Sequence, residues 1–246
     1  GRPFPRRSPR IAPSSPPQAA SLPPHCSARF MQALWLARHG NRQDFVDPEW
    51  AATADRPHDP RLSPDGVQQA RRLSARVSSL GVDRILSSPF LRAVQTAHPA
   101  ARALDAQVVL EPGLGEWFND DWFETRPQTF SPSTLQEEFD RVAPPPSDAP
   151  CREPSFPESR PDALRRLGAT GQCLASRYPD ETLFLVGHGI TVLGVLRGLV
   201  GSDVPDPGCP LASLTKIVCT EDGWEVALRN DTSHLDSGAR AADRLS

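Results

Sequence analysis

The sequence predicts an α/β fold: a three-layer α/β/α sandwich with a mainly parallel central sheet and a late antiparallel hairpin. Short apolar runs of strand length alternate with longer segments whose apolar residues recur at helical spacing, which is typical of a parallel sheet covered on both faces. The last two apolar runs are instead joined by a turn. The 246 residues, 38% hydrophobic and 23% charged, fit one large globular domain.

The first 30 residues differ in composition from the rest. They hold eight of the 28 prolines and five arginines, and no acidic residue precedes Asp44. Such a segment cannot form a core, so we expect either a disordered leader or the remnant of an organellar transit peptide. The only methionine, Met31, stands ahead of the first apolar run. We therefore expect a domain over residues 31–236, a frayed tail at 237–246, and a cytoplasmic location, with a plastid or mitochondrion as the alternative.

The first half of the domain is expected to alternate strands and helices. Ser63 and Pro64 supply an N-cap and a first-turn proline for a helix that ends near Gly81. The same Ser-Pro pair at 88–89 predicts the start of a second helix, with apolar positions up to Leu104. The three strands expected around these helices are 33–37, 84–87 and 108–110.

Between residues 111 and 161 the periodic pattern fails, because ten prolines interrupt it. An irregular stretch of this length inside a domain is usually a functional insertion or a disordered one. Its front half carries aromatic residues and its back half, 143–159, contains a run of three prolines. We expect 111–161 to form a lid insertion that ends in an extended surface loop.

The second half resumes with regular structure. A helix is expected over 162–177, a strand over 182–186, and a buried helix over 190–200, where the sequence is apolar almost all round. Strands at 215–220 and 224–228 are joined by Glu221-Asp222-Gly223, which is typical of a hairpin turn.

Two histidines flanked by glycine each follow an apolar strand. His39 follows the first strand and His188 follows the strand at 182–186. Ligands bind beyond the carboxyl ends of parallel strands, so both imidazoles could face one crevice. Arg42 lies three residues after His39, and Arg92 lies in the first turn of a helix, whose N-terminus is positive. Arginines that converge with a helix N-terminus form an anion site. For each residue alone, a structural histidine or a surface arginine is the alternative.

Several classes of protein are excluded by composition. No apolar run approaches the roughly 20 residues that cross a bilayer. Residues 31–246 hold 22 basic residues against 30 acidic ones, a net charge of −8 that disfavours nucleic acid. The five cysteines form no Cys-x-x-Cys pair and no zinc-ligand pattern with the histidines, so we expect free cysteines and no zinc site.

Four motifs follow one another along the chain. They are Arg38-His39-Gly40-Asn41-Arg42, Ser88-Pro89-Phe90-Leu91-Arg92-Ala93-Val94-Gln95-Thr96-Ala97, Glu111-Pro112-Gly113-Leu114-Gly115-Glu116-Trp117 and Gly187-His188-Gly189. In this order they resemble the motifs of the histidine phosphatase (phosphoglycerate-mutase-like) superfamily. The second and third are most similar to the branch that holds the Sts-type tyrosine phosphatases and the ecdysteroid-phosphate phosphatases. The resemblance extends over about residues 33 to 235.

The resemblance implies a metal-independent phosphomonoester hydrolase without a cofactor. His39 would be the nucleophile that becomes phosphorylated, and Glu116 would donate a proton to the leaving oxygen. Desolvation by Trp117 and Phe118 is expected to raise the pKa of Glu116. The residues expected around the phosphoryl oxygens are Arg38, Arg42, Arg92 and His188. Rival proton donors are Asp120, Asp121 and Glu124. Asn41 departs from the acid that many members carry at that position.

Two other functions stay open: a phosphoglycerate-type mutase, and a catalytically weak module that binds phosphorylated ligands. The Glu-Ser pair and the lysine-containing loop of the glycolytic mutases are missing, and Lys216 is the only lysine, which disfavours the mutase. The expected partner is a small-molecule or phosphotyrosine-like phosphomonoester, with no nucleic acid and no membrane, and a homodimer is possible. The aromatics expected either to stack on a bulky leaving group or to pack the insertion onto the sheet are Trp117, Phe118, Trp122 and Phe123.

Overall fold

The structure is a computed structural model that describes residues 32–146 and 152–235. Its centre is a seven-stranded mixed sheet in the order β4-β3-β2-β5-β1-β6-β7. β1 to β5 run parallel, and β6 is antiparallel to both β1 and β7, which confirms the predicted fold class. The strands are β1 (Ala33–Arg38), β2 (Arg84–Ser87), β3 (Val108–Leu110), β4 (Val142–Ala143), β5 (Leu183–Gly187), β6 (Leu214–Thr220) and β7 (Gly223–Asp231). The leader and the tail predicted from the sequence lie outside the described residues.

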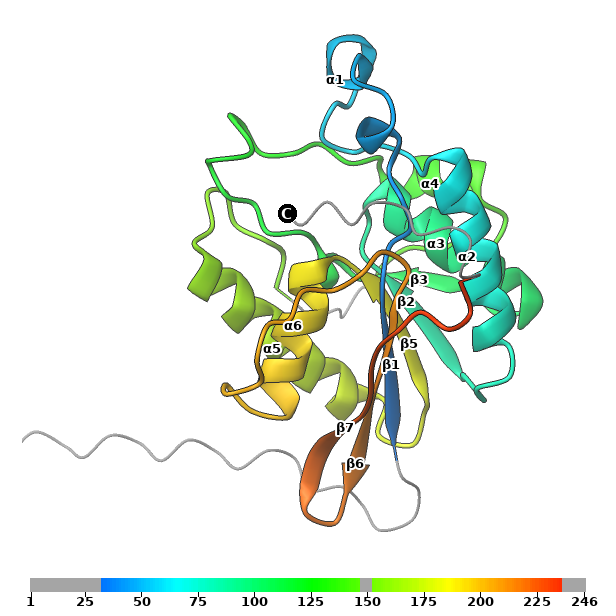
Figure 1. Ribbon diagram of the computed structural model, residues 1–246, viewed down its shortest axis with the longest axis vertical. Coiled ribbons are helices and arrows are strands. Elements are labelled where there is room, and N and C mark those ends of the chain that lie inside the picture. Colours follow the sequence, from blue (N-terminus) through cyan, green and yellow to red (C-terminus); the bar gives the residue numbers. More distant parts are fainter. Residues whose placement is uncertain (1–31, 147–151, 236–246) are drawn as a thin grey trace, which may run out of the picture.

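Helices cover both faces of this sheet, with α5 and α6 on one side and α2, α3 and α4 on the other (Figure 1). The short helices α1 and α4 and the strand β4 were not expected from the sequence. The helices are α1 (Trp50–Thr53), α2 (Pro64–Val77), α3 (Leu91–Ala103), α4 (Pro132–Glu138), α5 (Arg160–Arg177) and α6 (Gly189–Leu199), with 3₁₀ turns η1 (Gln43–Phe45) and η2 (Pro112–Leu114).

The two helix starts predicted from Ser-Pro pairs have different outcomes. Ser63 caps α2 as predicted, because its side chain accepts a hydrogen bond from the backbone N–H of Gly66. α3 begins at Leu91, so the predicted cap at Ser88 is wrong. The N–H of Leu91 donates instead to Asp59 Oδ1 at 2.9 Å, a contact between segments far apart in the sequence. The Ser88 hydroxyl contacts His188 Nε2 at 2.9 Å and accepts a hydrogen bond from the N–H of Phe90 at 3.4 Å.

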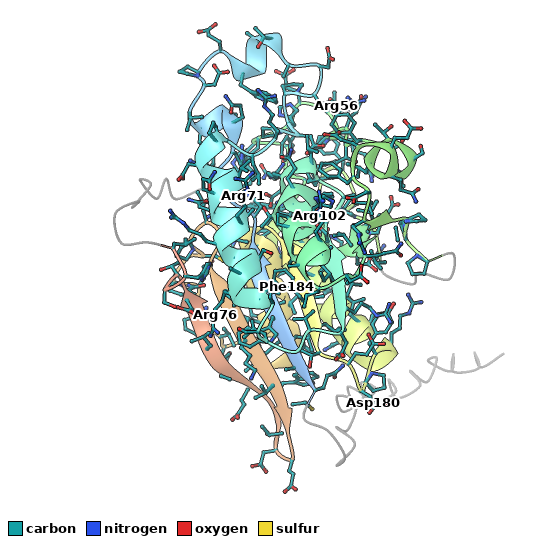
Figure 2. All side chains as sticks on the ribbon, turned by 90° about the vertical axis from the view of Figure 1, so that its right-hand side faces the viewer. Arg56, Arg71, Arg76, Arg102, Asp180 and Phe184 are labelled. Carbon is teal, nitrogen blue, oxygen red and sulfur yellow. The ribbon has the colours of Figure 1, made fainter. Side chains whose placement is uncertain are left out.

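Alternating strand residues feed two apolar layers. On β1, Trp35 and Ala37 join the cluster that includes residues of α2 and α3, whereas Leu34 and Leu36 join the cluster that includes residues of α5 and α6. Phe184 of β5 lies within the first of these layers, while Arg71 and Arg102 are exposed on the outside of α2 and α3 (Figure 2). These two arginines therefore lie on the surface, away from the core.

In the described part of the insertion, residues 111–146 and 152–161, the chain is irregular apart from η2, α4, β4 and the start of α5 at Arg160. Phe118 and Phe123 are buried and pack with Phe90 at the start of α3. These two aromatics therefore serve packing, whereas Trp122 remains 48% exposed.

The cysteines differ in part from the prediction. Cys173 and Cys209 are free. Cys219 is disulfide-bonded, which corrects the expectation of free cysteines at that position. No helix formed by the described residues is both long and apolar enough to cross a membrane.

Candidate active site

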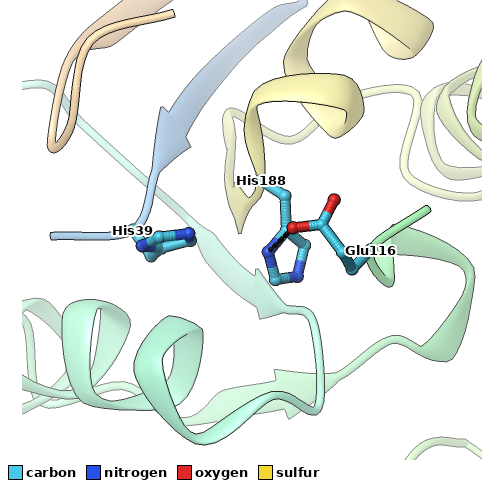
Figure 3. Close-up of side chains that lie close together, drawn as sticks. All are labelled: His39, Glu116 and His188. Atoms are coloured by element: carbon cyan, nitrogen blue, oxygen red, sulfur yellow. Dashed lines mark ion pairs between the residues drawn. The ribbon is translucent and has the colours of Figure 1, made fainter. Parts of the chain in front are cut away.

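The two histidines lie side by side because their strands are neighbours. β1 and β5 pair in parallel with Arg38 opposite Gly187, so the residues that follow them leave the sheet at the same edge. The N–H of His39 donates to the carbonyl of Gly187 at 2.9 Å. The two rings meet edge to face with centroids 5.4 Å apart, and both side chains are buried (Figure 3).

His39 is held as a neutral imidazole with a defined tautomer. Its Nδ1 lies 2.8 Å from the carbonyl of Gly40, which can only accept, so Nδ1 carries the proton and Nε2 keeps its lone pair. Burial first, then the charge of Arg92 and other nearby cations, lowers the pKa of His39 well below 6.5. An unprotonated imidazole nitrogen is the form that can act as a nucleophile.

His188 occupies the N-cap of α6 and is contacted on both ring nitrogens. Nε2 lies 2.9 Å from the hydroxyl of Ser88, and Nδ1 lies 3.1 Å from Oε2 of Glu116. Burial is the main cause that lowers the pKa of His188 to about 4. The neutral ring therefore donates from Nδ1 to the carboxylate and accepts from the serine.

Arg92 is the most deeply buried cation of this cluster. Its side chain is 2% exposed, with Nη2 3.4 Å from Glu116 Oε2 and Nη1 3.7 Å from Asp59 Oδ1. Burial lowers the pKa of Arg92 to about 10, so the guanidinium stays charged at neutral pH. Among the described residues, Nε and Nη1 of Arg92 and Nε of Arg38 have no hydrogen-bond partner. Buried N–H donors of this kind require an acceptor, which an anion would supply.

Arg38 and Arg42 complete the positive end of the site. Arg38 Nη1 donates to the carbonyl of Cys209 at 2.6 Å, which aims the guanidinium across the ends of the strands. Arg42 forms a two-pronged ion pair with Asp44, in which Nε lies 2.9 Å from Oδ1, and stacks 4.3 Å above the ring of Phe45. Asp44 thus neutralises part of the charge of Arg42.

The pKa of Glu116 is lower than the aromatic residues next to it in the sequence would predict. Burial raises the pKa of this carboxyl, as predicted, but His188, Arg92 and the N–H of Trp117 together hold it below the ordinary range. The Trp117 N–H donates to Oε1 at 3.1 Å. The predicted increase is therefore reversed, and Glu116 is ionised when no ligand is bound. Its rivals Asp120, Asp121 and Glu124 are exposed and do not line the cavity.

Arg38, Arg42, Arg92 and Glu116 line the inner end of a cavity of about 490 Å³. His39 and His188 are buried and are not among the residues that line it. Its outer walls are mostly aromatic and apolar. They include Phe45, His58, Trp117, Trp122, Phe123, Ile190 and Leu193. The predicted site residues are thus brought together at one place, with an apolar chamber above them.

A metal ion fits this cluster less well than an anion does. His39, Glu116 and His188 each offer a ligand atom, and these atoms lie within 4.8 Å of one another. Three guanidinium groups border the same space, and two of them hold unpaired N–H donors. Those donors and charges would repel a cation and would bind phosphate or a similar anion.

The sequence interpretation missed two members of the site. Asp59 is buried between the start of α3 and Arg92, and Ser88 contacts His188 rather than capping a helix. Ser88 had a local signal, but the Ser-Pro pair favoured the wrong role. Asp59 had none, because its partners lie about thirty residues further along the chain.

Comparisons with known proteins agree on one family. Residues 34–232 match the family model of the histidine phosphatase superfamily (branch 1). The chain is 31% identical over 220 residues to the probable phosphoglycerate mutase GpmB of Yersinia enterocolitica, which covers 85% of this chain and 97% of that protein. It is 27% identical over 195 residues to the transcription factor tau 55 kDa subunit of Saccharomyces cerevisiae, covering 71% of this chain but only 42% of that protein's length.

Solved structures share the fold at low sequence identity. The ecdysone phosphate phosphatase of Bombix mori superposes with a TM-score of 0.64 at 19% identity, over 86% of this chain and 98% of that one. A phosphoserine phosphatase of Entamoeba histolytica superposes with a TM-score of 0.59 at 21% identity, over 83% of this chain and all of that one.

Proposed function

We propose that this chain, which belongs to branch 1 of the histidine phosphatase superfamily, is a metal-independent phosphomonoester hydrolase that acts through a phosphohistidine. The observation that carries the proposal is one juxtaposition. The unprotonated Nε2 of His39 lies in a buried cluster where guanidinium N–H donors lack a partner. Phosphoryl transfer requires a nucleophile beside N–H donors that are available to bind the phosphoryl oxygens.

In the first step, His39 Nε2 forms a bond to phosphorus while the bond from phosphorus to the leaving oxygen breaks. Glu116 gives its proton to that oxygen. The bound phosphate is negative and offsets Arg92, which raises the pKa of the carboxyl and allows it to hold this proton. In the second step, a water attacks the phosphohistidine and Glu116 takes the proton of that water. Inorganic phosphate leaves, and His39 is free again.

The cations spread around the phosphoryl group serve both steps. Arg38, Arg42 and Arg92 stabilise the charge on the equatorial oxygens of a loose transition state. His188 adds no positive charge, because burial keeps its ring neutral. It contributes a hydrogen bond and holds the Glu116 carboxylate.

The outer chamber favours bulky or aromatic leaving groups, as in the Sts-type and ecdysteroid-phosphate phosphatase branch. Trp122 is exposed at the cavity and its ring lies 5.2 Å from that of Trp117, so a flat apolar group can stack there. The charged side chains of this wall are paired. Arg160 lies 2.7 Å from Asp206, and Asp44 pairs with Arg42. The ecdysone phosphate phosphatase that shares the fold supports the same choice of substrate class.

A phosphoglycerate-type mutase is the second candidate, and the GpmB relatives favour it. A mutase must hold a second anionic group of its substrate. Of the described residues in the outer wall of the cavity, Arg160 is the one cationic side chain, and it is paired with Asp206. Hydrolysis is therefore the better fit.

The test measures phosphate release from an aryl phosphate with a chelator present. We expect turnover and an acid-labile phosphoenzyme after rapid quenching, and His39→Ala should abolish both. His98→Ala is the matched control, since His98 lies on α3 and pairs with Asp140 away from the cavity. Turnover by His39→Ala would refute the mechanism. Isomerisation of a phosphoglycerate faster than hydrolysis would favour the mutase, and ligand binding without a phosphoenzyme would favour a binding module.

A further inference from the structure

A buried arginine lies beneath the loop that carries Glu116. Arg166 is in α5, its side chain is 3% exposed, and it does not line the cavity. A buried guanidinium is costly to desolvate unless its donors are satisfied. The partners of Arg166 therefore indicate its role.

All of the N–H donors of Arg166 are used on two targets. Nε and Nη2 lie 2.8 and 2.9 Å from the two carboxylate oxygens of Glu158. Nη1 donates to the carbonyls of Gly113 at 2.8 Å and Gly115 at 3.2 Å, and Nη2 donates to the carbonyl of Glu116 at 3.2 Å. One rigid planar group thus contacts three carbonyls within four consecutive residues, ending at the proposed proton donor itself.

Glu158 holds the other side of the same loop. Its backbone N–H donates to the carbonyl of Phe118 at 2.8 Å, and its carbonyl accepts from Trp117 Nε1 at 2.6 Å. The backbone on both sides of Glu116 is therefore attached to one buried ion pair. These contacts fix the backbone that carries the Glu116 side chain. The contacts of the carboxyl itself with His188 and Arg92 are additional to them.

We propose that Arg166 is a positioning residue that sets where the Glu116 carboxyl stands relative to the leaving oxygen. A general acid must lie within hydrogen-bond reach of the atom that it protonates, and a displacement of about 1 Å can cost about a hundredfold in rate. Arg166 touches neither the phosphate site nor the nucleophile in this structure. Its loss should therefore impair proton donation and leave attack by His39 largely intact. This inference rests on the proposed function.

The test uses two substrates that differ in their need for a proton. Phenyl phosphate releases a basic phenolate, whereas 4-nitrophenyl phosphate releases a stable one. Arg166→Lys keeps a charge beside Glu158 but cannot form the fork to three carbonyls. The matched control is Arg165→Lys, on the same helix, whose arginine is exposed and pairs with Asp162. kcat/KM is measured because it reports the step in which the leaving group departs.

We expect Arg166→Lys to lower kcat/KM about 10- to 100-fold for phenyl phosphate and only a few-fold for 4-nitrophenyl phosphate. Glu116→Gln should show the same pattern, and Arg165→Lys should show neither loss. Equal losses for both substrates, or no loss, would overturn the proposal. If Arg166→Lys does not fold, by circular dichroism, Glu158→Gln is read in the same way. A wild-type enzyme without a phosphoenzyme would instead refute the proposed function.

Discussion

The carboxylate of Glu116 contacts the imidazole of His188, with Oε2 3.1 Å from Nδ1, in a site that also holds Arg92. The pKa of Glu116 is lowered and that of His188 falls to about 4. At neutral pH the pair is therefore a carboxylate and a neutral ring that shares its Nδ1 proton. When an anion binds beside this pair, its negative charge favours the protonated form of the Glu116 carboxyl. The pair can therefore take up a proton together with the anion.

The first prediction concerns the pKa of His39, the proposed nucleophile. Burial and the charges of Arg92, Arg38 and Arg42 disfavour the imidazolium of His39, so its pKa lies below 6.5 and the ring stays neutral as pH falls through 6.5. Arg42→Gln removes one of these charges and should raise that pKa. Titration of the His39 ring by NMR measures its pKa in the wild-type protein and in Arg42→Gln, with Arg102→Gln as the control. A wild-type pKa at or above 6.5, or no increase in Arg42→Gln, would contradict this account.

The second prediction concerns the leaving group. Trp122 is one of two exposed large apolar side chains among the described residues, and it lines the cavity. Loss of aromatic stacking costs about 0.5–1.5 kcal/mol, so Trp122→Ala should raise KM for an aryl phosphate up to about tenfold. A small alkyl phosphate should be unaffected. Val46→Ala, which changes the other exposed apolar side chain outside the cavity, should change neither KM. Equal effects on both substrates would show that Trp122 only supports the fold.

Residues whose partners are close in sequence were the predictable part of this fold. The apolar runs located β1, β2, β3 and β5 to within a residue or so, because burial on both faces leaves a continuous apolar signal. The start of α3 was misplaced because its first N–H is capped by Asp59 from another segment. The two-residue strand β4 and the short helices carry too little periodicity to be recognised.

The site divides in the same way. Glycines after two strands and the motifs around them indicated His39, His188 and Arg92, and the structure places them together. The ionisation of Glu116 was predicted in the wrong direction, since its local aromatic neighbours suggested desolvation alone. The groups that prevail are His188, which follows β5, and Arg92 of α3, and the contacts of Arg166 with this loop come from α5. Such contacts appear only when distant segments are brought together.

The third prediction concerns the contact between α5, which carries Arg166, and α6, which follows His188. A Cβ added at Gly198 would lie 2.3 Å from the Cα of Gly168, which is backbone and cannot move alone. Gly198→Ala should therefore lower the free energy of unfolding by about 3 kcal/mol. Gly189→Ala in the same helix meets nothing nearer than 3.8 Å and should cost little. Urea denaturation measures both, and equal costs would refute the packing argument.

The last prediction uses Asp59, the buried acid next to Arg92. Burial raises its pKa from 3.8 to about 6, against the opposing effects of Arg92 and the Leu91 N–H. The folded state thus binds this proton more tightly than the unfolded chain does. The stabilising contribution is complete below pH 3.8 and is lost as pH rises through 6. The shift corresponds to about 3 kcal/mol.

Asp59→Asn cannot ionise, and its Oδ1 can still accept from Leu91. Its free energy of unfolding, relative to wild type, should therefore rise by up to about 3 kcal/mol between pH 4 and pH 7. Urea titrations at a series of pH values measure this difference. Asp180→Asn, at an exposed turn after α5, is the matched control. A constant difference for Asp59→Asn would mean that Asp59 is ionised across this range and that its charge is fully balanced by Arg92.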